Sequence, residues 1–222
     1  MVYQIIETTR KWIEKSFIKL DHEVELLLFT AKKELCLACN EIEELAAQLA
    51  ELSPKIKVTS GLLDNDAMRG EYRIDKHPAM LIHGLKDYKI RFFGVPSGLE
   101  FNPFIETVVA VSTGTTDLPQ SVVDKLAGIT DPVHIQVFTT PTCPYCPKVV
   151  RIAHQFAMIN DKITSDMIDA MEFRELATHY GVFGVPKTVI NDKVSLDGLV
   201  GPDILIDAIL EALKKREISF HV

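Results

Sequence analysis

The chain of 222 residues lacks the marks of several classes of protein. It has no run of about 18 apolar residues, so no segment is expected to span a membrane. Its first residues, MVYQIIETTRKWIEKSF, contain neither a long apolar run nor a small-residue cleavage site, so they do not form a secretory signal. No block of Lys and Arg stands out and the formal net charge is -7, which argues against nucleic acid as a partner. The sequence therefore predicts a cytoplasmic protein that binds neither membrane nor nucleic acid.

Cysteine, Asn and Gln are also scarce. The four cysteines all stand in Cys-x-x-Cys pairs, which leaves none for a scattered disulfide framework. Asn and Gln number five each, and a low content of these thermolabile amides indicates a thermophilic source. By contrast, 47% of the residues are hydrophobic, which is enough to fill one large core or two ordinary ones.

The two cysteine pairs mark an internal repeat. The first pair lies in ELCLACNE and the second in TTPTCPYCPKVV, at an offset of 107 residues. Three further landmarks recur at an offset of 107 or 108. The matched residues are Cys36 and Cys143, Tyr72 and Tyr180, Pro78 and Pro186, and Gly94 and Gly201. The chain therefore consists of one folding unit that occurs twice.

Both units predict the same order of elements, α-β-α-β-α-β-β-α. The early strands alternate with helices, which favours parallel neighbours, while HGLKD and ND are short enough to join the last two strands as antiparallel hairpins. The segment STGTTDLPQ has little apolar content and separates the units. We therefore predict an α/β protein with units at 1–115 and 116–222, each a mixed β-sheet with helices on both faces. The expected strands are 24–31, 55–63, 77–83 and 88–94, and then 134–140, 162–170, 185–191 and 193–201.

Three roles are open to the Cys-x-x-Cys pairs. A four-cysteine zinc site is the first, but zinc knuckles usually stand about 15–20 residues apart, and here a whole folding unit separates the pairs. A structural disulfide is the second, but closing so short a loop removes little entropy from the unfolded chain. Reversible redox chemistry is the third, and it is favoured because each pair stands where a strand passes into a helix.

The start of a helix favours a thiolate, because unpaired backbone N–H groups and the positive end of the helix dipole face it. Cys36 and Cys143 are therefore predicted to attack a substrate disulfide. Cys39 and Cys146, one turn further on, are predicted to resolve the mixed disulfide that results.

Charges on the helices that follow the cysteines differ between the pairs. The first helix carries Glu41, Glu43, Glu44 and Glu51, partly offset by Lys32 and Lys33 before it. The second helix carries Lys148, Arg151 and His154. We therefore expect Cys143 to be the more acidic thiol and its pair to be the more oxidising.

Each unit resembles thioredoxin, and CPYC is the active-site sequence typical of glutaredoxins. The tandem arrangement has RFFGVPSGLEF toward the end of the first unit and PTCPYCPKVVRIAHQFA in the second. Over essentially the whole chain it is similar to the protein disulfide oxidoreductases of thermophilic archaea and bacteria. The resemblance implies two tandem thioredoxin-like units that reduce, oxidise and isomerise disulfides of protein substrates. No cofactor and no metal are expected.

The same resemblance gives Pro78 and Pro186 a role, because the proline before the third strand of a thioredoxin-like fold is cis and faces the cysteine pair. The backbone of the preceding residue, His77 or Val185, would then pair with an extended substrate peptide. Tyr145, between the cysteines of the second pair, would shape the contact with the substrate. The alternative is that each proline only opens a strand, where a missing N–H does little harm.

The sequence departs from the family pattern in two places. Neither LLLFTA nor IQVFTT holds the buried acid that thioredoxins carry in the strand before the cysteines. Asp169 and Glu172 are candidates for taking the proton of the second resolving thiol, although surface solvation is the ordinary role of such acids. The segment DGLVGPD matches the glutathione-binding sequence of glutaredoxins poorly, which argues against glutathione as a substrate.

Two other functions remain open. The chemistry also suits a dedicated electron relay that is reduced by a thioredoxin-reductase-like flavoprotein and serves a peroxidase. The fold also suits a non-catalytic, chaperone-like module that binds unfolded chains. The expected partners are proteins that carry disulfides or dithiols.

Overall fold

The same order of elements occurs twice in the computed structural model, which describes residues 4–31 and 36–214. The first set ends at Thr113 and the second begins at Gln120, so the last helix of the first set and the first helix of the second each overlap an end of the segment STGTTDLPQ. The first set comprises α1 (Glu7–Phe17), β1 (Val24–Phe29), α2 (Leu37–Leu52), β2 (Ile56–Thr59), η2 (Leu62–Asp64), α3 (Asp66–Glu71), β3 (Ala79–His83), β4 (Asp87–Phe93), η3 (Gly98–Glu100) and α4 (Phe101–Thr113). The second comprises α5 (Gln120–Ala127), β5 (Val133–Thr139), α6 (Cys146–Ile159), β6 (Ile163–Asp169), α7 (Arg174–His179), β7 (Lys187–Ile190), β8 (Val194–Asp197) and α8 (Pro202–Lys214).

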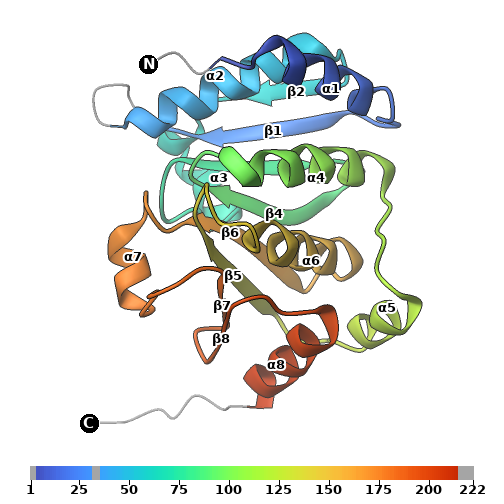
Figure 1. Cartoon of the computed structure of the whole chain (residues 1–222), viewed down its shortest axis with the longest axis vertical. Coiled ribbons are helices and arrows are strands. Elements are labelled where there is room, and N and C mark those ends of the chain that lie inside the picture. The colour runs from blue at the N-terminus through green and yellow to red at the C-terminus, as the bar shows by residue number, and fades with distance from the viewer. Residues whose placement is uncertain (1–3, 32–35, 215–222) are drawn as a thin grey trace.

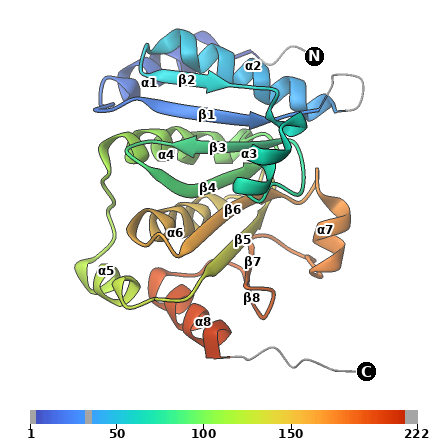
Figure 2. The ribbon, with the colours of Figure 1, turned by 180° about the vertical axis from the view of Figure 1, so that it is seen from behind.

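The two sets of strands join edge to edge in one mixed sheet. Within the described residues the strand order is β2-β1-β3-β4-β6-β5-β7-β8. The join is a parallel pairing of β4 with β6, from Ile90 opposite Ser165 to Phe93 opposite Ile168, and Figure 2 shows these strands side by side. The predicted mixed sheet of each unit is thus found as one half of a larger sheet.

Helices cover both faces of the sheet, as predicted, but very unequally. One face is packed against the helices that precede the strands, follow the cysteines and close each unit, as the view in Figure 1 shows. The opposite face carries the short helices α3 and α7, which lie nearer the viewer in Figure 2. The six-residue length of α3 and of α7 leaves part of that face uncovered.

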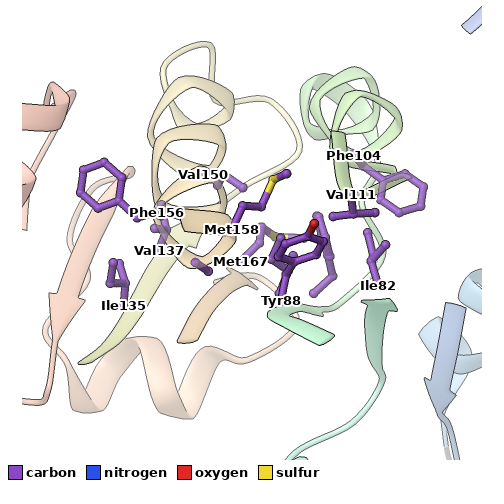
Figure 3. Packing of buried hydrophobic residues seen from close by; sticks show 14 of the residues in the cluster. Ile82, Tyr88, Phe104, Val111, Ile135, Val137, Val150, Phe156, Met158 and Met167 are labelled. Carbon is purple, nitrogen blue, oxygen red and sulfur yellow. The ribbon is translucent and has the colours of Figure 1, made fainter. Parts of the chain in front are cut away.

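The main hydrophobic cluster runs across the join between the two units. It contains Ile82, Tyr88 and Phe104 from the first unit together with Val137 and Phe156 from the second. Figure 3 shows these side chains between α4, α6 and the strands below them. The core is therefore shared, although the expected division at 1–115 and 116–222, which falls between α4 and α5, stays a prediction.

The expected apolar stripes of the two long helices form part of this core. The helical period predicts apolar faces at 42, 45, 46, 49 and 52 in α2 and at 149, 152, 153, 156 and 157 in α6. All of these residues are buried in the structure except Leu52, which is half-buried. Each stripe turns one side of its helix toward the sheet, and this fixes the cysteine-bearing end of the helix above the end of the preceding strand.

Candidate redox sites at one edge of the sheet

The first cysteine pair lies at the start of α2, as predicted. Cys36 is the N-cap of this helix, and its Sγ accepts a hydrogen bond from the backbone N–H of Cys39 at 3.1 Å. The two residues form a disulfide with a Cα–Cα distance of 5.3 Å. Cys36 is partly exposed and Cys39 is fully buried, with its Sγ accepting a hydrogen bond from the N–H of Ala31. A substrate can therefore reach the first sulfur of the pair and not the second.

The second pair has the same geometry but stands differently relative to its helix. Cys143 and Cys146 form a disulfide with a Cα–Cα distance of 5.6 Å, and the N–H of Cys146 donates to Cys143 Sγ at 3.1 Å. Helix α6 begins at Cys146, so Cys143 precedes it instead of opening it. Pro147 accounts for the difference, because a helix capped by Cys143 would need the backbone N–H of residue 147 to donate to the carbonyl of Cys143, and proline has no N–H. Cys143 is 6% exposed, whereas Cys146 is fully buried.

Both disulfides lie at the same edge of the sheet. Strands β1 and β5 run parallel through the chain of pairings that connects them, so their carboxyl ends, which lead to Cys36 and Cys143, point the same way. This edge is on the left in Figure 1. Three strands separate β1 from β5, which corresponds to roughly 20 Å at the usual strand spacing. The four cysteines therefore do not gather into one tetrahedral zinc site.

The two predicted cis prolines lie beside these disulfides. The peptide bonds His77–Pro78 and Val185–Pro186 are both cis. Pairing of β1 with β3 and of β5 with β7 places each proline next to the end of a cysteine-bearing strand. Pro78 and Pro186 are buried, His77 is exposed and Val185 is half-buried. Tyr145 is 58% exposed. The substrate-binding roles expected for these five residues stay predictions.

A buried acid that the sequence does not reveal lies close to the second disulfide. Glu100 is 2% exposed, and neither of its carboxylate oxygens has a hydrogen-bond partner among the described residues. Its short helix η3 packs against α6, and the preceding N–H of Leu99 donates to Pro141, two residues before Cys143. Burial raises the pKa of Glu100 to about 8, and the nearby Asp169 adds to the rise. The signal in the sequence is a single acid before the apolar helix FNPFIETVVAV.

Of the two acids named as candidates from the sequence, Asp169 lies near Glu100 in the structure, and Glu172 lies near Asp169. Burial raises the pKa of Asp169, although N–H groups of Met171 and Glu172 that donate to its carboxylate counter the rise. Glu172 is exposed, and its pKa is raised by its partial burial, by Asp169 and by Glu41 of α2. The acids of both units thus meet at this edge, with Glu100 as the buried member.

The expected charge difference between the two pairs is smaller than the sequence indicates. His154 is 1% exposed and burial lowers its pKa to about 3, so it is neutral at physiological pH and adds no positive charge. Arg151 is paired with Glu106 at 3.0 Å and with Asp117 at 2.9 Å. Lys148 is exposed and is the remaining cation of the three. Lys32 and Lys33, which were expected to offset the acids of α2, lie outside the described residues.

Comparison with known structures decides the fold. The NTD_N/C domain of the alkylhydroperoxide reductase AhpF from Enterococcus faecalis superposes with a TM-score of 0.86 over 93% of this chain and 100% of that one, at 26% identity. A protein disulfide oxidoreductase from Aeropyrum pernix superposes with a TM-score of 0.86 over 96% of this chain and 97% of that one, at 24% identity. The thioredoxin domain family matches residues 133–218. The chain is a tandem thioredoxin-fold protein.

Among sequence relatives, the alkyl hydroperoxide reductase AhpF of Staphylococcus epidermidis is 32% identical over 155 residues, or 69% of this chain and 28% of the relative. The chain thus spans less than a third of the length of this curated relative. With a thioredoxin fold and two Cys-x-x-Cys disulfides, the predicted fold and the predicted enzyme class, a thiol–disulfide oxidoreductase, are confirmed.

No helix in ranges 4–31 and 36–214 is long and apolar enough to cross a membrane. No three His, Cys, Asp or Glu side chains in the same ranges come together as a group that could hold a metal ion.

Proposed function

We propose that this tandem thioredoxin-fold protein is a protein dithiol–disulfide oxidoreductase with two sites that each exchange with protein substrates. The observation that carries the proposal is the matched geometry of the two disulfides. In each, the first sulfur accepts the N–H of the second cysteine and the second sulfur is buried. In each pair the first cysteine is the more exposed of the two, which is the arrangement that attack followed by intramolecular resolution requires.

Each exchange takes place in two steps. In the reduction of a substrate, the Cys143 thiolate attacks one sulfur of the substrate disulfide, a mixed disulfide forms, and the other substrate sulfur leaves as a thiolate that takes up a proton. The Cys146 thiolate then attacks Cys143 Sγ and the second substrate sulfur leaves in the same way. The enzyme is oxidised to the disulfide and the substrate is reduced to two thiols. Cys36 and Cys39 are assigned the same two roles.

We assign to Glu100 the role of accepting the proton that Cys146 loses and of returning it in the reverse reaction. A buried thiol must lose its proton before it attacks, and water has no access to Cys146, which is fully buried. A carboxyl with a pKa of about 8 is well matched to a thiol of ordinary pKa, near 8.5, so the proton can pass in either direction as the pair is oxidised or reduced. The first unit therefore supplies a group that serves the site of the second.

The substrate contacts are proposed as follows. The backbone of His77 and of Val185 pairs with an extended substrate segment, Pro78 and Pro186 hold that backbone beside the disulfide, and Tyr145 contacts the substrate of the second site. The spacing of roughly 20 Å between the two disulfides prevents direct exchange between them, since sulfur atoms must touch to exchange. We also propose that the protein acts in the cytoplasm.

An electron relay is the second candidate, and the relatives favour it. The matched relatives carry the name of an alkyl hydroperoxide reductase, AhpF. By analogy, this chain would take electrons from a thioredoxin-reductase-like flavoprotein and pass them to a peroxidase. The relay uses the same disulfides and differs from the first proposal in the range of proteins that it serves.

Reduction of insulin by dithiothreitol tests the first proposal. The variants Cys36→Ser/Cys39→Ser and Cys143→Ser/Cys146→Ser each retain one site, and the variant with all four substitutions is the control. We expect acceleration by the wild type and by each double-serine variant, and none by the four-serine variant. No acceleration of insulin reduction by the wild type would support a chaperone-like module. No acceleration of insulin reduction together with electron transfer to a peroxidase, measured in a separate assay, would support a dedicated relay.

A further inference from the structure

The buried sulfur of the first pair receives a hydrogen bond that the buried sulfur of the second pair lacks. The backbone N–H of Ala31 donates to Cys39 Sγ at 3.3 Å. Cys39 and Cys146 are both fully buried, but no donor to Cys146 Sγ occurs among the described residues. A thiolate gains more from such a donor than a disulfide sulfur or a neutral thiol does, because the hydrogen bond is then assisted by charge. The N–H of Ala31 therefore favours the form of Cys39 that attacks in the resolving step.

The residue before this N–H is Thr30, which lies just beyond the sheet. The pairing of β1 with β3 ends where Phe29 faces Ala79, and Thr30 is the next residue of the chain. Its carbonyl carbon is bonded directly to the nitrogen of Ala31. The position of Thr30 thus decides where the N–H of Ala31 points.

The side chain of Thr30 is tied to the helix that carries Cys39. Thr30 is 7% exposed, and its Oγ1 donates to Glu43 Oε1 at 2.5 Å. Glu43 follows Cys39 by four residues on α2, so the two side chains leave the same side of the helix one turn apart. Helix α2 therefore holds, through Glu43, the peptide group that contacts Cys39 Sγ.

The second unit does not have this tether. Thr139 is the counterpart of Thr30, since each follows a phenylalanine that pairs with the residue after a cis proline. Thr139 Oγ1 is directed instead toward β6, where it lies 3.2 Å from Met167 Sδ and 3.5 Å from the carbonyl oxygen of Ile168. Four residues after the second cysteine of this unit, the acid is replaced by Val150, which offers no acceptor.

The connection from strand to cysteine is also longer in the first unit. Cys36 follows Thr30 by six residues, whereas Cys143 follows Thr139 by four. A longer connection allows the chain more conformations after the strand. A side-chain tether at Thr30 restricts those conformations just where the N–H of the next residue must be placed.

We propose that Thr30 and Glu43 are positioning residues of the first site. Their hydrogen bond holds the N–H of Ala31 against Cys39 Sγ and so stabilises the thiolate that resolves the mixed disulfide. The inference rests on the proposed function and adds the means by which one of its two buried sulfurs is activated. A hydrogen bond that only satisfied the buried hydroxyl of Thr30 would contribute to stability and leave the chemistry unchanged, so the two roles give different results.

The test uses the parent variant Cys143→Ser/Cys146→Ser, in which the first site acts alone, and dithiobis(nitrobenzoate) as the disulfide. The Cys36 thiolate attacks this reagent, a mixed disulfide forms, and one thionitrobenzoate leaves. The Cys39 thiolate then attacks Cys36 Sγ and the second thionitrobenzoate leaves, so the enzyme is oxidised to its disulfide and the reagent is reduced to two thiolates. The coloured thiolate appears in two phases. The second phase is independent of the reagent concentration and gives the rate of resolution.

Adding Thr30→Val to the parent should slow the second phase by about threefold and leave the first phase unchanged. A loosened N–H is expected to lower the thiolate fraction of Cys39 about tenfold, and the greater nucleophilicity of a more basic thiolate offsets part of that loss. Thr30→Ser keeps the hydroxyl and should restore the rate of the parent. Thr59→Val removes another hydroxyl of this unit, which donates to Glu25 Oε1 at 2.7 Å, and as the matched control it should change neither phase.

Two substitutions of Glu43 separate its position from its charge. Glu43→Ala and Glu43→Gln both remove the negative charge, but only the glutamine keeps an oxygen that can accept a hydrogen bond from Thr30. Glu43→Ala should therefore show a second phase about threefold slower than that of Glu43→Gln.

The thiolate of Cys39 can also be observed directly. When Cys36→Ser is added to the parent, Cys39 is the remaining cysteine, and the ultraviolet absorbance of its thiolate is followed against pH. Thr30→Val should raise the midpoint of this titration by about one pH unit, which corresponds to the tenfold change in thiolate fraction.

A second phase that Thr30→Val leaves unchanged would overturn the inference, as would equal slowing by Glu43→Ala and Glu43→Gln or an unmoved titration midpoint. Loss of the first phase as well would also overturn it, because the hydrogen bond would then hold the whole site and not one N–H. If the parent itself shows no second phase, the first site does not resolve, and the proposed function fails there together with the inference. A second phase in the parent that responds to none of the variants would leave the proposed function standing.

Discussion

Arg91 and Asp166 form a buried, bidentate ion pair between the two units. Arg91 Nε lies 2.6 Å from Asp166 Oδ1, and Arg91 Nη2 lies 2.7 Å from Oδ2. The arginine comes from β4 and the aspartate from the adjacent strand β6. Arg91 Nη1 also donates to the carbonyl oxygens of Tyr72 and Arg73, so its charge is well satisfied within the sheet.

Removing one partner of this pair should destabilise the whole chain. Asp166→Asn leaves the buried guanidinium of Arg91 without its counter-charge, and we expect a loss of about 3–5 kcal/mol in the free energy of unfolding at pH 7. Urea denaturation followed by circular dichroism measures it. Asp203→Asn, which breaks an exposed pair with Lys125, is the control and should leave stability nearly unchanged. A similar small effect at Asp166 would show that the join does not depend on the pair.

The same pair predicts how stability changes in acid. Burial alone would raise the pKa of Asp166, but Arg91 and His134 outweigh it and lower the pKa from 3.8 to about 2. The folded chain therefore stays ionised at this site after the unfolded chain has taken up a proton. The stabilisation is present above pH 3.8 and is lost as the pH falls from there to about 2. Acid titration of Asp166→Asn should lack this loss, and an unchanged acid limb would contradict it.

Replacing Glu100 should slow resolution at the second site. With Glu100→Gln in the Cys36→Ser/Cys39→Ser background, Cys146 has no buried proton acceptor of matched pKa, and we expect oxidation of the dithiol to slow by about 100-fold. The rate of the wild-type site should also show an inflection near pH 8 that the variant lacks. Glu106→Gln, an exposed acid on α4, is the control. An unchanged pH profile would remove Glu100 from the mechanism.

Glu100 should also make the chain less stable at high pH. Its pKa of about 8 lies above the ordinary value of 4.5, so the unfolded chain releases this proton first as the pH rises. Because burial disfavours the ionised carboxylate, the free energy of unfolding is unaffected by this group below pH 4.5. It falls as the pH rises from 4.5 to about 8 and changes no further above that. Glu100→Gln should therefore gain stability relative to the wild type between pH 5 and pH 9, as thermal unfolding at each pH would measure.

Gly98→Ala should impair the second site alone. The new Cβ meets the carbonyl of Pro141 and the backbone is at a φ of +59°, so the loop that leads to Cys143 must shift. We expect the exchange rate of this site to fall by about tenfold, since small displacements of reacting groups cost that much or more. Gly70→Ala, where a Cβ meets nothing within 4 Å, is the matched control. An equal fall at the first site, measured with Cys143→Ser/Cys146→Ser, would indicate general unfolding instead.

The two attacking thiols should differ in acidity. We expect Cys143 to titrate below Cys36 in alkylation by iodoacetamide against pH, measured on the two double-serine variants. Lys148→Glu should raise the pKa of Cys143, because it reverses a charge near the start of α6. His154→Gln should leave it unchanged, because His154 is neutral in the folded chain. A response to His154→Gln would show that this buried ring does carry charge.

Local features of the sequence were enough for much of the fold. The strand that ends before Cys36, the helix stripe from Ile42 to Leu49 and the repeat of X-Pro at Pro78 and Pro186 all depend on short-range rules of apolar period and backbone preference. The cysteine pairs are similarly local, since two sulfurs three residues apart at a helix start must meet. The later start of α6, at Cys146, also has a local cause, because Pro147 cannot donate the backbone hydrogen bond that a helix capped by Cys143 would need.

Only the tertiary structure decided what the two units do to each other. The two repeats can be read from the sequence, but the pairing of β4 with β6 cannot. Pairing between distant strands depends on the complete set of side chains where the two units join. Where the two units meet, Glu100 is buried on a short helix that contacts α6, burial keeps His154 neutral, and Leu99 is hydrogen-bonded to Pro141, two residues before Cys143. Burial and charge depend on neighbours far along the chain, so pKa values and shared sites follow from the folded assembly and not from the residues alone.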